Sequence, residues 1–190
     1  LAAGVLGSAG SVTAHGHFAD APFANTYYHA ELADSLAGFD LSPTTYDIQS
    51  QFSTNFTFYY GLDGKTPAGL VNFLDVVMHE YAHGLGFSNF ENEGTGAWLG
   101  FNGTPNSGLP DAYSQFTYDN TAGLFWTQMT QPQRAASGLN YGNVVFTGAN
   151  ATAGAKLLLD DRRDFRVTSP APLAGNYSYG TASFGPAITT

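Results

Sequence analysis

Apolar residues recur at three- and four-residue steps between residues 70 and 85, and this spacing predicts an amphipathic helix. The apolar stripe consists of Leu70, Leu74, Val77, Met78, Tyr81 and Leu85. Thr66 and Pro67 suit the start of this helix, because Thr can cap a helix and Pro fits its first turn. Gly84 and Gly86 predict its end, since glycine tolerates the left-handed turn by which a chain leaves a helix.

A second helix is predicted from Tyr27 to Ala37, opened by Asn25 and Thr26 and stopped by Gly38. Its apolar face would be formed by Tyr28, Leu32 and Leu36. His29 lies off that face, so its side chain is expected to be exposed to solvent.

Alternating polar and apolar positions predict a half-buried strand at residues 47–53, and residues 56–60 suit a second strand. A hairpin between the two is the simplest interpretation, because Thr54 and Asn55 form a turn signal. Residues 1–11 are small and rich in glycine, and they predict a loop. Residues 89–110 are so dense in turn formers that they predict a long irregular loop.

The C-terminal part of the chain predicts one short helix and several strands. Thr130 and Gln133 have the spacing of a capping box, which predicts a helix up to Ser137 with Gly138 after it. Short strands are predicted at residues 143–147, 156–159 and 165–168, with coil or an edge strand from Ser169 onward. Together the elements predict a loop-rich α+β fold in one domain, residues 1–190.

Composition narrows the class of protein. The chain has 190 residues, a formal net charge of −9 and only 11% charged residues, and its sequence pI is about 4.6. An acidic chain is a poor partner for nucleic acid or anionic membranes. The sequence lacks cysteine and any apolar run long enough to span a bilayer. Its composition is typical of a secreted protein, and its start at Leu1 suggests a processed or partial chain.

The predicted helix at residues 70–85 also contains candidate catalytic chemistry, in the motif His79-Glu80-x-x-His83. Residues four apart on a helix point the same way, so the two imidazoles are expected to hold one zinc ion. Glu80 lies beside them, where it is expected to accept a proton from the attacking water.

With Gly86 included, the motif resembles the start of the metzincin signature. More closely, residues 21–143 resemble the catalytic region of bacterial secreted HExxH proteins that carry a protease-associated domain. The matching pieces are Ala21–Tyr28, Tyr59–Gly64, the HExxH segment, Pro110–Tyr113 and Met129 with Gln133–Ser137. The resemblance implies a zincin-like catalytic domain in which a small mixed sheet accompanies the zinc-binding helix and a second, C-terminal helix. It also implies peptide substrates, and it places upstream strands and an accessory protease-associated domain outside this sequence.

The third zinc ligand departs from the metzincin pattern, because Asn89 stands where that signature has His or Asp. We favour Asp111, which lies between the glycine-rich loop and the methionine segment; Asp119 and Asn89 remain the alternatives. The resemblance also suggests Met129 as the methionine beneath the zinc. His15 and His17 are weaker metal candidates, and Asp63 could contact a structural Ca²⁺ ion.

These observations predict a secreted, zinc-dependent endopeptidase with Glu80 as the general base. Two other classes of function stay open at this point. One is a degenerate zincin that serves as a binding or adhesion module, and the other is a structural component of an extracellular assembly.

Overall fold

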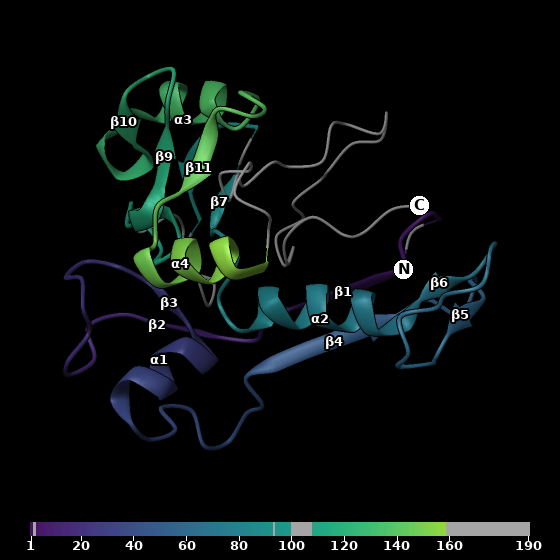
Figure 1. Cartoon of the computed structure of the whole chain (residues 1–190). Coiled ribbons are helices and arrows are strands. Elements are labelled where there is room, and N and C mark those ends of the chain that lie inside the picture. Colours follow the sequence, from purple (N-terminus) through teal and green to yellow (C-terminus); the bar gives the residue numbers. More distant parts are fainter. Residues whose placement is uncertain (2, 93, 100–107, 159–190) are drawn as a thin grey trace. The chain divides into compact units, whose positions relative to one another are not determined.

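A computed structural model describes residues 1, 3–92, 94–99 and 108–158 (Figure 1). This part of the chain contains short strands paired in small sheets and four α-helices, which confirms an α+β fold. The described residues divide into two compact units. The first unit comprises Leu1–Ala24 and Tyr28–Ser88, and the second comprises Asn25–Tyr27 and the described residues from 89 to 158. None of the helices in the described residues has the length and apolar character needed to cross a bilayer.

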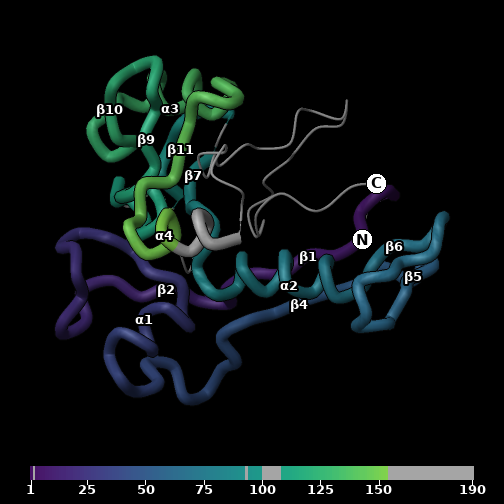
Figure 2. Tube along the Cα trace, in the orientation of Figure 1, coloured from purple at the N-terminus to yellow at the C-terminus, as the bar shows by residue number. Residues whose placement is uncertain are grey.

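The first unit is built on two antiparallel strands and a long helix. Strand β1 (Gly7–Ser11) pairs with β4 (Ile48–Phe52), with Gly7 opposite Phe52 and Ser11 opposite Ile48. Helix α2 (Phe73–Gly84) packs along both strands (Figure 2). The expected loop at residues 1–11 is therefore wrong over β1, where small residues let the helix approach the strand closely.

The expected hairpin between residues 47–53 and 56–60 is also wrong. β4 occupies most of the first segment, but its partner is β1. The second segment contains β5 (Phe58–Tyr59), which pairs in parallel with β6 (Val71–Asn72). Both pairings join residues distant in sequence, so a turn signal between neighbouring segments could not indicate them.

Helix α2 begins later than the sequence suggests. Its N-cap is Asn72, whose side-chain oxygen accepts hydrogen bonds from the backbone N–H of Leu74 and Asp75. Thr66 and Pro67 precede the helix by several residues, because residues 71 and 72 are paired in β6. The predicted end is confirmed: the helix stops at Gly84, and Gly86 follows with φ 104°.

The face that α2 buries differs from the predicted apolar stripe. The buried residues are Val76, Glu80, His83 and Gly84. Leu74, Met78, Tyr81 and Leu85 are 40–64% exposed. Val76 instead joins a core with Leu6 and Phe58, surrounded by further aromatic residues, Phe52, Phe56 and Phe73. The inner face of the helix is therefore chosen by the fit to β1 and β4 rather than by the largest apolar side chains.

The remaining elements of the first unit are a strand pair and helix α1 (Ala30–Ala37), which ends at Gly38 as predicted. β2 (Ala14–His15) pairs antiparallel with β3 (Tyr28–His29). The predicted start of the helix at Tyr27 is wrong, because residues 28 and 29 belong to β3. His29 is the N-cap of α1 and is 1% exposed, so its predicted exposure is wrong as well.

The second unit contains the remaining short elements. They are β7 (Glu91–Asn92), β8 (Ala97–Trp98), the 3₁₀ helix η1 (Ser114–Phe116), β9 (Thr117–Asp119), β10 (Leu124–Phe125), the 3₁₀ helix η2 (Trp126–Gln128), α3 (Gln131–Ser137), β11 (Val144–Phe146) and α4 (Ala149–Leu158). β7 and β8 form an antiparallel pair, and β9 lies between β10 and β11 in an antiparallel sheet. The hydrophobic core of the second unit consists of Trp98, Trp126, Met129 and Val144.

Two predictions in the second unit are confirmed. Helix α3 has the capping box formed by Thr130 and Gln133, and β11 lies within the strand expected at residues 143–147. The strand expected at 156–159 is wrong, because residues 156–158 continue α4. The segments expected from residue 165 onward lie outside the described residues.

Candidate functional site

The imidazoles of His79 and His83 converge on one point at the C-terminal end of α2. Their Nε2 atoms are 3.0 Å apart, and the two ring planes are nearly perpendicular at 87°. Zinc–nitrogen bonds of 2.0–2.1 Å around a tetrahedral ion would place two ligand nitrogens about 3.3 Å apart. The observed separation is close to that value, so the pair suits two ligands of a single ion.

His83 is oriented by a second contact on the other side of its ring. Its Nδ1 lies 3.0 Å from the carbonyl oxygen of Phe87. A carbonyl can only accept, so Nδ1 carries a proton, and in the neutral form of the ring Nε2 keeps its lone pair. Gly86 makes this contact possible, since its φ of 104° turns the chain back toward the helix. A backbone carbonyl on the far nitrogen is the usual partner of a histidine that ligates a metal.

Glu80 is fully buried between α2 and β1. A Cβ atom added at Gly7 would lie 3.0 Å from Cγ of Glu80 and 3.2 Å from Val76, so this glycine admits the helix at close range. Among the described residues of the first unit, no third His, Asp or Glu donor lies within 4.8 Å of both histidine nitrogens. That includes Glu80, and its role as a proton acceptor beside the pair stays a prediction.

His29 is a buried polar residue that sequence reasoning missed. Its Nε2 lies 2.7 Å from Oγ of Ser88, a residue 59 positions later in the chain. Burial, and then the charge of His83, lowers the pKa of His29 to about 3, so its ring is neutral near pH 7. Only a three-dimensional pairing of this kind could have shown that the side chain is internal.

In the second unit, Asp111 is a buried acceptor of hydrogen bonds. One oxygen accepts from the N–H of Ser114, and the other accepts from the N–H of Phe90 and the hydroxyl of Ser114. Burial raises the pKa of Asp111, and these hydrogen bonds lower it by less. The carboxylate thus caps the start of η1, and its part in a metal site stays a prediction.

Asp119 is more fully occupied than Asp111. Its Oδ1 accepts from the N–H groups of Thr121 and Ala122, and its Oδ2 accepts from the hydroxyl of Ser137 at 2.6 Å. The amide of Asn140 contacts both oxygens. Burial alone would raise the pKa of Asp119, but the hydrogen bonds outweigh it and lower that pKa overall.

The other predicted residues of the second unit also have structural contacts. Oδ1 of Asn89 accepts from the N–H of Glu91 at 3.1 Å. Met129 is 5% exposed and packs in the core with Trp98 and Trp126. Ordinary core packing therefore accounts for Met129, and its placement beneath a metal stays a prediction.

A buried cation in the same unit was also missed by sequence reasoning. Arg134 lies 3.9 Å from the buried carboxylate of Glu91 and 4.0 Å above the ring of Trp98. It donates to the carbonyl oxygens of Gly96 and Met129. These contacts join α3 to the β7–β8 pair, so the role of Arg134 is structural.

Neither a family model, nor a curated protein, nor a solved structure matches the chain. The resemblance to metzincins therefore stays a prediction, based on the residues quoted above.

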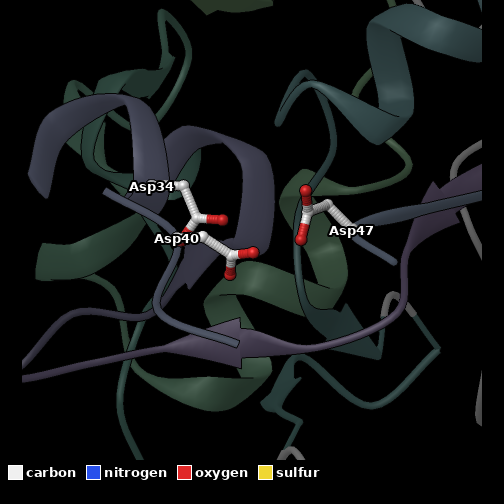
Figure 3. Close-up of side chains that lie close together, drawn as sticks. All are labelled: Asp34, Asp40 and Asp47. Carbon is white, nitrogen blue, oxygen red and sulfur yellow. The ribbon is translucent and has the colours of Figure 1, made fainter. Parts of the chain in front are cut away.

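A separate acidic cluster lies in the first unit. One carboxylate oxygen each from Asp34, Asp40 and Asp47 can be chosen so that all three lie within 4.8 Å of one another (Figure 3). Among the described residues, this is the one group of three metal-ligating side chains close enough for a single ion. Oxygen ligands suit a hard cation such as Ca²⁺ rather than zinc. Exposed acidic clusters are also common without an ion.

The weaker candidates have local contacts of their own. Asp63, the residue expected to contact Ca²⁺, accepts from the hydroxyl of Tyr59 and the N–H of Lys65 in an exposed turn. His15 lies 3.1 Å from the hydroxyl of Ser42. His17 has a left-handed backbone with φ 61°. None of these features brings Asp63, His15 and His17 together at one site.

Proposed function

We propose that this chain is a secreted zinc-dependent endopeptidase with a zincin-like catalytic domain. The observation that carries the proposal is the 3.0 Å separation of the Nε2 atoms of His79 and His83. Two imidazole nitrogens in this arrangement suit one ion, and imidazole nitrogen is a preferred ligand of zinc. The contact between His83 Nδ1 and the Phe87 carbonyl supports the same assignment.

The residues of α2 divide the chemistry between them. A zinc ion held by the two imidazoles would act as a Lewis acid toward water and toward the scissile carbonyl. Glu80 accepts the proton of the attacking water and then passes it to the nitrogen of the leaving amine. Its side chain is buried between α2 and β1.

Asp111 is the third ligand that we favour, and the number of hydrogen bonds supports this choice. A carboxylate has about four lone-pair positions. Asp111 accepts three hydrogen bonds from other residues. Asp119 accepts from two backbone N–H groups, from the Ser137 hydroxyl and from the side-chain NH₂ of Asn140, which reaches both of its oxygens. Asn89 offers only an amide oxygen, which is a weak zinc ligand.

The test is to purify the whole chain without added metal and to measure its zinc content and its cleavage of casein. We expect about one zinc per chain and cleavage that a chelator removes and zinc restores. The variant His79→Ala should lose both. A wild-type chain with far less than one zinc, and with no cleavage sensitive to chelator, would contradict the proposal and favour a binding or adhesion module.

A further inference from the structure

The turn after α2 is fastened to a residue far away in the sequence. Ser88 is buried, and its hydroxyl lies 2.7 Å from Nε2 of His29 and 3.4 Å from the carbonyl oxygen of His83. Both contacts form together when the Nε2–H of His29 donates to Oγ of Ser88 and the Ser88 hydroxyl donates to the backbone carbonyl oxygen of His83. One hydroxyl thus links the buried ring of His29 to the last turn of α2.

The ring of His29 also lies against the turn itself. A Cβ atom placed on Gly86 would be 3.6 Å from Nδ1 of His29 and 3.2 Å from Leu32 of α1. The turn therefore packs on the beginning of α1, with His29 on one side and Leu32 beside it. Its conformation determines where the Phe87 carbonyl points.

The backbone of His29 is held on both sides, which makes it a rigid anchor. It pairs with Ala14 in the β2–β3 ladder, and the N–H of Ala30 donates to the hydroxyl of Ser11 at 2.7 Å. A ring fixed in this way can fix what it contacts.

We propose that His29, acting through Ser88, is a positioning residue for His83. It holds residues 85–88 so that the Phe87 carbonyl accepts from His83 Nδ1, which leaves His83 Nε2 as the metal-binding nitrogen. The proposal rests on the proposed function, because it assigns His29 and Ser88 to the orientation of one of the two zinc ligands. Outer partners of this kind tune metal affinity by about 10–100-fold.

The test compares two disruptive variants with a rescue and a matched control. His29→Phe keeps a ring but removes the donor, and Ser88→Ala removes the hydroxyl. His29→Gln restores an N–H near the position of Nε2. The control is Ser53→Ala, because Ser53 and Ser88 are both 8% exposed and both lie in the first unit. Ser88→Ala is a small change, so it serves if His29→Phe does not fold.

Two measurements are made on each variant. The zinc Kd, from competition with a coloured chelator, should rise about 10-fold or more in His29→Phe and Ser88→Ala. It should return toward the wild-type value in His29→Gln and stay unchanged in Ser53→Ala. Nitrogen-15 NMR of the metal-free protein should show His83 protonated on Nδ1 in the wild type, with protonated Nε2 appearing in the two disruptive variants.

The two measurements separate the inference from the proposed function. If wild-type protein binds no zinc, the proposed function fails, and the tautomer of His83 still tests the positioning role. If the disruptive variants keep both the wild-type tautomer and, where zinc binds, a Kd within twofold, His29 does not position His83 and the inference is overturned.

Discussion

The C-terminal half of α2 in the first unit and residues 111–140 in the second both bury ionisable side chains, but in opposite ways. On α2, the Nε2 atoms of His79 and His83 face each other at 3.0 Å. In the second unit, hydrogen-bond donors surround the carboxylate of Asp119 on both oxygens. We propose that the first arrangement binds an ion, whereas the second uses the lone pairs of its carboxylate to hold loops in place.

This difference shows that the type of a residue alone does not distinguish a candidate metal ligand from an acceptor of structural hydrogen bonds. Asp111 and Asp119 were equally plausible as oxygen ligands by type. Asp119 accepts from one donor more than Asp111, and an occupied lone pair must lose a hydrogen bond before it can bind a metal, so we keep Asp111 as the proposed ligand.

The largest expected effect concerns Glu80 in the first region. Glu80→Gln keeps the size of the side chain and removes the base, so casein cleavage should fall about 10²–10⁴-fold, the usual contribution of a positioned base. The zinc content of the variant should equal that of the wild type. Cleavage at the wild-type rate by protein that carries zinc would exclude Glu80 as the base.

The second region should respond in stability rather than in zinc binding. Asp119→Ala leaves several donors without their acceptor, including the Ser137 hydroxyl, and should lower the free energy of unfolding by about 3 kcal/mol. Chemical denaturation measures this change. His79→Ala is the matched opposite: it should abolish zinc binding and change the stability of the metal-free protein by less than about 1 kcal/mol.

The contribution of Asp119 should also depend on pH in a defined direction. Its pKa is lower in the folded state than its ordinary value of 3.8. The stabilisation is therefore complete above pH 3.8 and is lost as the pH falls through the folded-state pKa. The stability difference between wild type and Asp119→Ala should shrink between about pH 5 and about pH 2. An equal difference at both ends would show that the carboxylate charge is not what stabilises this region.

The smallest expected effect comes from Gly7, which lies against Glu80. In Gly7→Ala the new methyl group meets Cγ of Glu80 at 3.0 Å, so the carboxylate must shift by a few tenths of an ångström. We expect kcat for casein to fall by about 2–10-fold, since small misplacements of a catalytic group are costly. The zinc Kd should stay the same.

Gly94→Ala is the control for this variant, because its added Cβ meets only an ordinary contact at 3.5 Å. It should leave kcat unchanged. A Gly7→Ala variant that cleaves casein as fast as this control would show that the contact with β1 does not set the position of Glu80.

Local signals in the sequence predicted local features correctly. The pairing of His79 with His83 follows from helical spacing, and the capping box of Thr130 and Gln133 is complete within four residues. Gly86 was expected to end the helix and has the positive φ that this requires. Each of these features depends on neighbours along the chain.

Features that depend on distant partners were missed. β1 has a sequence of small residues, and only its pairing with β4 and its contact with α2 make it a strand. The same contact buries Glu80 while Met78 remains 64% exposed, which reverses the predicted apolar face. The buried ring of His29 has its hydrogen-bond partner in Ser88, 59 residues away.

The central claim is that His79 and His83 hold one zinc ion between them. An anomalous difference map at the zinc edge, from crystals of the whole chain, tests it most directly. We expect a peak about 2.1 Å from the Nε2 atoms of both His79 and His83. A map in which the two imidazoles are well ordered but the zinc lies only at Asp34, Asp40 and Asp47, or nowhere, would contradict the account.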